Sequence, residues 1–191
     1  MEAGIEKRKQ INLSEIYDNE TVIEIAKTEQ LNSILCSKPN DAWVKTNKYA
    51  NNSKYLPIDK VEFLLRKIFK HFKIEITGQG VAFNGVWVTV RVHYVDPISQ
   101  EWHYHDGIGA QELQVKQGSS PAQLESINKG ALSMAFPIAK SFAVKDACDH
   151  FGDIFGANLN RKDTIDFYVD QKIIDNAQKA QEEFSKIIDN K

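Results

Sequence analysis

The residues best suited to bind a metal ion lie on two predicted strands. His103 and His105 are one residue apart, so they share a strand face, and His93 lies on the strand expected to pair with theirs. Zinc sites need about four nitrogen, oxygen or sulfur ligands. Asp106 falls on the opposite face, and no second cluster of carboxylates or cysteines completes a shell. We therefore interpret the histidines as cross-strand neighbours, predict no metal and no cofactor, and keep a metal-dependent nuclease as an alternative hypothesis.

Other catalytic arrangements have no support in the sequence. There is no Gly-x-x-x-x-Gly-Lys-Ser/Thr phosphate loop, so nothing indicates ATP hydrolysis. Neither Ser141 nor Cys148 has a base at helical spacing on its own face. Asp146, Asp149 and Asp153 with His150 form no more complete a ligand set than the strand histidines do. The sequence therefore predicts no catalytic residues and a protein that is not an enzyme.

A basic and aromatic stretch is better suited to binding than to catalysis. Residues 45–73 contain eight Lys and Arg against two acids, whereas residues 164–191 contain four lysines against six acids. Trp43 and Tyr49 stand between Lys45, Lys48 and several asparagines in a predicted polar loop, residues 39–53. Rings on which bases stack, beside lysines that meet phosphates, are typical of single-strand binding. The alternative is that Trp43 only fixes the loop to the core, and the sequence leaves both interpretations open.

Length and composition are consistent with one folded domain and peripheral segments. The chain has 191 residues, 42% of them hydrophobic, and a formal net charge of −2 that predicts neither a nucleic-acid nor a membrane partner. Cys36 and Cys148 are far apart, which favours reduced thiols and an intracellular location. No signal peptide and no apolar run of membrane-spanning length is visible, so we expect no membrane partner.

Apolar periodicity predicts helices at both ends of the chain and after Pro57. A capping box of Thr21 and Glu24 starts a predicted helix over 22–36, with Ile23, Ala26, Leu31, Ile34 and Leu35 inward. The next helix follows Pro57 and buries Val61, Leu64, Leu65, Ile68 and Phe72. A third spans 122–135, with a kink or restart expected at Pro137. A fourth carries Ala143, Ala147, Phe151 and Phe155 to a left-handed cap at Gly156. A tail helix has an apolar row of Val169, Ile173, Ala177, Ala180, Phe184 and Ile187.

Alternation at period two predicts three strands in the middle of the chain. Ile74 and Ile76 form a short strand that Gly78 and Gly80 should break. The next strand places Val86, Val88, Val90, Val92 and Tyr94 on one face. After a turn at Asp96-Pro97, residues 101–106 return as its partner, and Gly107 and Gly109 should end that strand.

These elements define a fold class and a division of the chain. We predict an α+β protein with an α-β-β-β-α core, an antiparallel sheet packed on a long helix, and peripheral N- and C-terminal helices. The predicted divisions are a partly mobile N-terminal segment over 1–36, a core domain over 37–163 and an acidic amphipathic helix over 164–191.

An ordered set of short motifs resembles a known family. The motifs are Thr89-Val90-Arg91-Val92, His105-Asp106-Gly107-Ile108-Gly109, Ala143-Val144-Lys145-Asp146-Ala147 and Phe155-Gly156-Ala157-Asn158-Leu159. Tyr55-Leu56, followed by a helix, resembles that family's entry into its first helix. Together they cover about residues 43–163 and resemble the annealing domain of the Rad-fifty-two superfamily, particularly its bacteriophage single-strand annealing recombinases.

The resemblance implies ATP-independent binding of single-stranded DNA and annealing of complementary strands in homologous recombination and DNA repair. It also implies a homo-oligomeric ring or filament, an annealed duplex intermediate, and a phage exonuclease or host single-strand-binding protein as further partners. The location would be the host bacterial cytoplasm if a phage encodes the chain. The resemblance and the nearby charges point to these DNA-binding residues: Lys45, Lys48, Lys54, Tyr55, Lys129, Lys140, Lys145, Arg161 and Lys162.

The chain departs from the family at the main helix. A family lysine–arginine pair falls on Asp149 and His150, and a further arginine falls on Asp153. Other cations must replace them if the chain binds DNA. A structural ring-forming adaptor without DNA binding therefore remains a third hypothesis.

Overall fold

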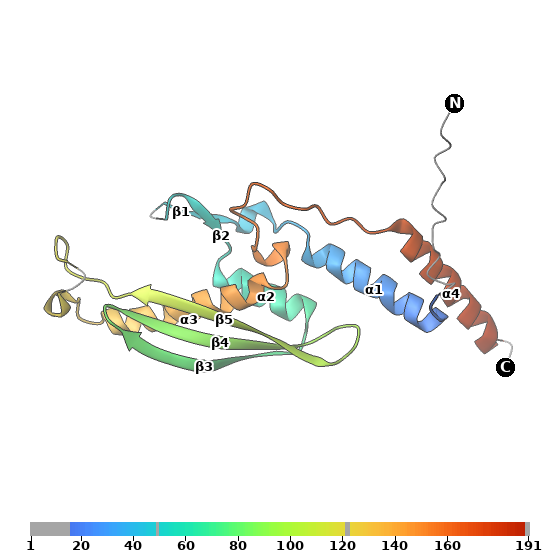
Figure 1. The fold of residues 1–191 in the computed structure, drawn as a ribbon, viewed down its shortest axis with the longest axis horizontal. Coiled ribbons are helices and arrows are strands. Elements are labelled where there is room, and N and C mark those ends of the chain that lie inside the picture. Colours follow the sequence, from blue (N-terminus) through green and yellow to red (C-terminus); the bar gives the residue numbers. More distant parts are fainter. Residues whose placement is uncertain (1–15, 49, 121–122, 190–191) are drawn as a thin grey trace, which may run out of the picture. The chain divides into compact units, whose positions relative to one another are not determined.

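The computed structural model describes residues 16–48, 50–120 and 123–189, so predictions for residues 1–15, for Tyr49 and for Ala122 lie outside its described part. The chain is α+β, and its three-stranded antiparallel sheet packs on a long helix, as predicted (Figure 1). It divides into two compact units, residues Leu35–Asp166 and the described parts of Met1–Ile34 and Phe167–Lys191. None of the described helices is both long and apolar enough to cross a membrane.

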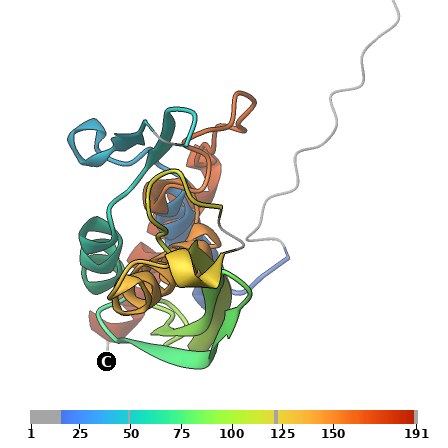
Figure 2. The ribbon, with the colours of Figure 1, turned by 90° about the vertical axis from the view of Figure 1, so that its left-hand side faces the viewer.

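The larger unit consists of a small hairpin, helices α2 and α3, and the main sheet. Its elements are η2 (Asp41–Trp43), β1 (Lys45–Asn47), β2 (Ser53–Tyr55), α2 (Ile58–Ile68), β3 (Phe72–Ala82), β4 (Gly85–Val95), β5 (Trp102–Glu112), η3 (Leu124–Ser126), α3 (Ala131–Asp149) and η4 (Asp153–Phe155). The end-on view of Figure 2 shows α3 against one face of the sheet.

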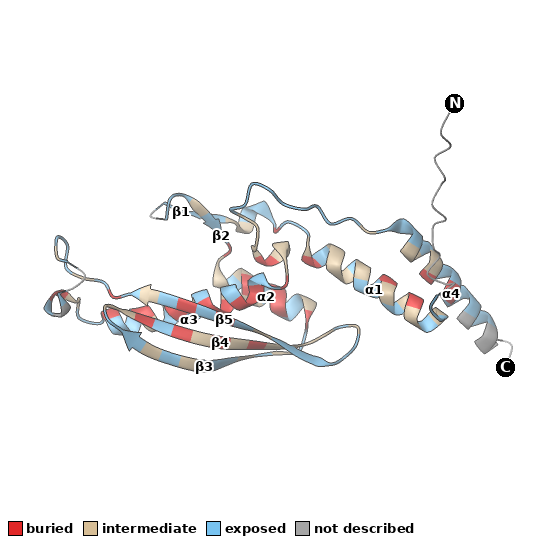
Figure 3. Cartoon of the chain, viewed as in Figure 1, coloured by how far each residue is buried: buried red, intermediate tan, exposed pale blue. Residues whose placement is uncertain are grey.

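The sheet has the order β3-β4-β5, with both pairs antiparallel. The valine row of β4 is buried, as its alternation predicted: Val86, Val88, Val90 and Val92. These side chains face α3, and the buried residues concentrate on β4, α2 and α3 (Figure 3). The alternating valines are therefore the sheet's contribution to the core.

The four glycines predicted to end or break strands do not do so. β5 continues through Gly107 and Gly109 because α3 passes directly over them. A Cβ atom on Gly109 would lie 2.1 Å from the Ala139 carbonyl oxygen. β3 continues through Gly78 and Gly80, where a Cβ on Gly80 would lie 2.9 Å from the Trp87 ring. The glycines make room for a helix backbone and an indole ring, and the predicted strand ends were wrong.

α3 also differs from prediction. The expected helix over 122–135 is absent from its described residues apart from η3 and the start of α3, which begins at Ala131 and continues through Pro137. An interior proline costs about 3 kcal/mol. We infer that the cost of Pro137 is offset by the packing of a buried alanine row of α3 on the sheet. This row includes Ala135 and Ala139.

The C-terminal end of α3 leads into an aromatic cluster. α3 ends at Asp149, and Gly156, with φ of 106°, ends the short helix η4 instead of the long helix. Phe151 and Phe155 are both buried, as predicted, with ring centroids 5.1 Å apart. Phe69 lies 4.4 Å from the Phe151 ring and links α2 to this cluster.

The predicted polar loop 39–53 is in part a β-hairpin. β1 and β2 pair with Lys45 opposite Tyr55. The Trp43 ring packs edge-on against Phe63 of α2, with centroids 5.6 Å apart. The structure therefore favours the interpretation in which Trp43 fixes this segment to the core.

The smaller unit is formed by α1 (Asn19–Leu35) and α4 (Gln171–Asp189), which pack through Val22, Ala26 and Ala177. Asp18, not Thr21, caps α1, because its Oδ1 accepts a 2.8 Å bond from the Thr21 amide. The predicted capping box was therefore wrong, as was the inward position of Ile34, which is exposed.

The predicted tail helix is shorter than expected. α4 begins at Gln171, so Val169 precedes it, and residues 164–170 have no regular secondary structure. Ala177 and Ala180 are buried as the apolar row predicted. The side chains of Phe184 and Ile187 lie outside the described residues.

Candidate nucleic-acid interface

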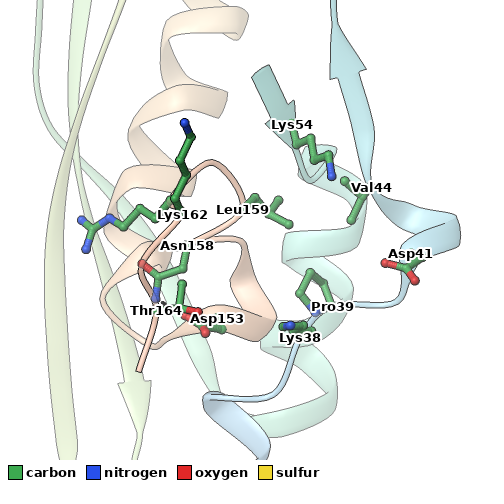
Figure 4. A pocket seen from close by; sticks show the side chains of 11 residues that line it. Lys38, Pro39, Asp41, Val44, Lys54, Asp153, Asn158, Leu159, Lys162 and Thr164 are labelled. Carbon is green, nitrogen blue, oxygen red and sulfur yellow. Dashed lines mark hydrogen bonds between the residues drawn. The ribbon is translucent and has the colours of Figure 1, made fainter. Parts of the chain in front are cut away.

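A cleft of about 320 Å³ lies between the segment before β1, strand β2 and the chain from η4 onward. We call it the basic cleft. Figure 4 shows its lining side chains, which come from these three segments: Lys38, Pro39, Asp41, Val44, Lys54, Asp153, Asn158, Leu159, Arg161, Lys162 and Thr164. Four of them are cations and two are carboxylates, while Pro39, Val44 and Leu159 give an apolar part to the wall.

Hydrogen bonds of two asparagines organise the wall of the basic cleft. The Asn160 side chain accepts a 2.7 Å bond from the Lys54 amide and donates a 2.8 Å bond to the Lys54 carbonyl. These bonds join positions 106 residues apart in the sequence. Asn158 Nδ2 donates to Asp153 Oδ1, which satisfies part of that carboxylate. Strand β2 and the 158–162 segment are thereby held together with their cations.

The charges of the basic cleft favour an anionic ligand. In the part of the chain that the structure describes, no carboxylate lies within 4.0 Å of the charged nitrogens of Lys38, Lys54, Arg161 or Lys162. All four residues are exposed. Cations without an internal partner are available to neutralise phosphates and release their counterions.

Next to the hairpin, Lys145 of α3 lies between two aromatic rings. Its Nζ is 5.2 Å from the Tyr55 ring centroid and 4.8 Å from that of Phe142. Burial lowers the pKa of Lys145, against an opposing effect of Asp149. Tyr55 and Phe142 remain 36% and 41% exposed, so each ring keeps surface on which a base could stack. We call Tyr55, Phe142 and Lys145 the lysine–aromatic cluster.

Lys45 and Asp149 are the charged neighbours of the lysine–aromatic cluster. Lys45 is exposed and is the cross-strand partner of Tyr55, so both side chains project from the same face of the hairpin. Burial, followed by the charge of Asp146, raises the pKa of Asp149 to about 6, although the residue as a whole remains exposed. An acid therefore stands one helical turn after Lys145, where the family resemblance has a cation.

The structure thus brings together two groups of predicted binding residues and separates the rest. Lys45, Tyr55 and Lys145 form one group, and Lys54, Arg161 and Lys162 form the other. Lys48 lies on the turn after β1, and Lys140 is exposed on α3. Lys129 precedes α3 and is roughly 20 Å along the helix axis from Lys145, at 1.5 Å per residue.

Three residues of this interface were missed by sequence reasoning. Lys38 had a weak signal, since it is a lysine beside a proline at a helix end. Phe142 was indistinguishable from a core aromatic, and Asn160 from any polar residue of a loop. Their contributions depend on contacts with residues distant in sequence.

The histidines occupy structural positions. His93 Nε2 lies 3.1 Å from Glu75 Oε2, and His105 Nε2 lies 3.3 Å from the Tyr94 hydroxyl. Burial, then His150 and His103, lowers the pKa of His105. Among the described residues, no three or more His, Cys, Asp or Glu side chains are grouped so that they could hold a metal ion.

The motif residues of the sheet and helix hold these elements to each other. Arg91 forms two bonds, of 2.7 and 2.8 Å, to the Asp106 carboxylate on the neighbouring strand. These bonds lower the pKa of Asp106. Asp146 Oδ2 accepts a 2.9 Å bond from the Ile108 amide of β5. Their role in the structure is to fix α3 and the strands, which in turn position Lys145.

No protein-family model matches this chain, and no curated protein matches it significantly. The functional argument therefore depends on the geometry of the basic cleft and the lysine–aromatic cluster.

Proposed function

We propose that this protein binds single-stranded DNA without ATP and anneals complementary strands as a homo-oligomer in recombination and repair. The observation that carries the proposal is the convergence on one cleft of four exposed cations that have no ion-pair partner among the described residues, next to two half-exposed rings that flank a lysine. The family resemblance supplies the annealing step and the wider setting of phage recombination.

The two parts of the interface have different chemistry. The basic cleft offers ammonium and guanidinium groups to the sugar–phosphate backbone, which they neutralise regardless of sequence. Tyr55 and Phe142 offer ring faces, and stacking on a ring is tolerant of sequence because every base has a π-face. A strand held through phosphates and a few stacked bases leaves its other Watson–Crick edges free to pair with a second strand.

Binding of this kind needs no bond-breaking chemistry. Annealing is favoured by base pairing itself, so the protein has only to reduce repulsion between the two phosphate backbones and to keep each strand unfolded. Cations that neutralise phosphates do the first. Ring stacking that competes with structure within a strand does the second.

An annealing assay without nucleotide tests the proposal. Two complementary oligonucleotides, one with a fluorophore and one with a quencher, are mixed with the full chain. We expect annealing to be faster than without protein, and a triple variant, Lys54→Ala, Arg161→Ala and Lys162→Ala, to lose most of that acceleration.

The matched control removes three exposed lysines elsewhere on the same unit that are not among the predicted binding residues, Lys67→Ala, Lys70→Ala and Lys116→Ala. It should anneal like the parent. Absence of binding and annealing in the parent would refute the proposal and favour an adaptor, whereas strand cleavage dependent on added metal would favour a nuclease.

A further inference from the structure

The outer edge of β3 is open in two respects. β3 is an edge strand that pairs only with β4 among the described strands, so one side of its backbone has no ladder partner. Its core-facing side chains are also uncovered, since Ile76 and Val81 are 47% and 57% exposed. Their β4 partners, Val90 and Val86, are buried. An open edge with exposed apolar side chains is a template for pairing with another strand.

The opposite edge of the sheet is protected. The β5 amide of Ile108 donates to Asp146 of α3, and α3 lies directly over Gly107 and Gly109. The helix contacts β4 and β5 and has no comparable contact with β3. Around Gly107–Gly109, α3 therefore obstructs the β5 edge, whereas no described element covers the β3 edge in a comparable way.

The chain contains an exposed segment with the pattern of such a strand. Residues 164–170 follow the basic cleft and have no regular secondary structure. In this segment Ile165 is 95% exposed and Tyr168 is 84% exposed. Apolar Ile165, Phe167 and Val169 alternate with Asp166, Tyr168 and Asp170. Alternation at period two gives a strand one apolar and one polar face. In solution this segment leaves apolar side chains in water unless something pairs with it.

We propose that residues 164–170 of one copy add to β3 of a second copy as the fourth strand of its sheet. The backbone of the segment would supply the ladder bonds that the β3 edge lacks. The row of Ile165, Phe167 and Val169 would cover Ile76 and Val81. At about 3.3 Å per residue the seven residues extend over about 23 Å, enough to pass the six residues from Ile76 to Val81.

The geometry favours a second copy over pairing within one chain. Thr164 lines the basic cleft, so the segment starts beside β2. Figures 1 and 2 both show the hairpin on one side of α3 and the edge strand β3 on the other. Each copy then has one donor segment and one acceptor edge. Such head-to-tail contacts generate rings if the rotation between copies closes and open filaments if it does not.

The inference is tested with two variants that block opposite halves of the contact. The donor variant carries Ile165→Asp and Phe167→Asp, and the acceptor variant carries Ile76→Lys and Val81→Lys. The parent should be larger than its 21.7 kDa monomer by size-exclusion chromatography with light scattering. Each variant alone should be monomeric, with an unchanged melting curve by circular dichroism. An equimolar mixture should form 1:1 heterodimers, because one donor and one acceptor remain.

Tyr168→Ser, which changes the other row of the segment, is the matched control and should assemble like the parent. A synthetic peptide of residues 163–171 should convert parent assemblies to monomers, and the same peptide carrying the two aspartates should not. A monomeric parent, variants that assemble normally, or a mixture that stays monomeric would each overturn the proposal. The peptide experiment gives the answer should the acceptor variant fail to fold. No DNA is present, so the outcome is independent of the proposed annealing activity.

Discussion

Salt dependence gives the most direct measure of how many cations in the basic cleft meet phosphates. Each phosphate neutralised on a single strand contributes about −0.7 to the slope of log K against log salt. Lys54, Arg161 and Lys162 line the cleft without an ion pair to any described residue. Replacing all three with alanine should therefore make the slope less steep by about 2. Over a fourfold increase in salt, the parent should lose about 16 times more affinity than the variant.

Fluorescence anisotropy with a labelled oligothymidine, titrated at four or five salt concentrations, measures both slopes. The control with Lys67→Ala, Lys70→Ala and Lys116→Ala changes net charge equally, so it separates contacts in the cleft from a general loss of positive charge. The reasoning is refuted if a folded cleft variant keeps the parent slope. Equal effects of the two triple variants would also refute it, because binding would then follow net charge and not this site.

Three further predictions concern the fold and its pH dependence. Gly109→Ala should destabilise the chain by at least about 3 kcal/mol, because the new Cβ meets the Ala139 carbonyl, whereas Gly118→Ala in open space should cost about 1 kcal/mol for its positive φ; equal melting temperatures would contradict this. Phe155→Ala should cost about 3–5 kcal/mol in urea unfolding, and a near-parental midpoint would mean that the aromatic cluster is not core. Asp149 has a folded-state pKa of about 6, above its unfolded-state value, so the native state binds its proton first and gains stability as pH falls from about 6 to 4. At pH 7 the free energy of unfolding of Asp149→Asn should therefore exceed that of the parent by about 1 kcal/mol, allowing for solvent screening, and this difference should disappear by pH 4. A difference that stays constant from pH 7 to pH 4 would contradict the assignment.

Local periodicity was sufficient to predict the elements whose own residues determine them. The alternating valines of β4 and Val61, Leu64 and Leu65 of α2 are buried as expected, because a strand or helix with one apolar face must cover it. Ile68 is only partly buried, and Phe72, predicted for the same helix, lies on β3 instead. Phe155 was predicted as core on the same grounds. The α+β class followed from the order of these elements.

Glycine and proline were misinterpreted because their effect depends on what lies next to them. Gly109 and Gly80 would break an isolated strand, yet here they admit the α3 backbone and the Trp87 ring. Pro137 would end an isolated helix, yet it lies within α3, whose alanine face packs on the sheet. Packing over a whole element outweighs the local preference of one residue. A short stretch of sequence does not show which distant segments will pack on it.

The candidate site, too, could be predicted from the sequence only in part. Charge and family resemblance indicated Lys54, Tyr55, Lys145 and Arg161 as separate members of a predicted DNA-binding set. Only the tertiary structure places Lys145 between two rings and joins β2 to Asn160 across 106 positions. A cleft requires residues from distant segments to meet at defined distances, and those distances are set by how the sheet, the helix and the hairpin pack together.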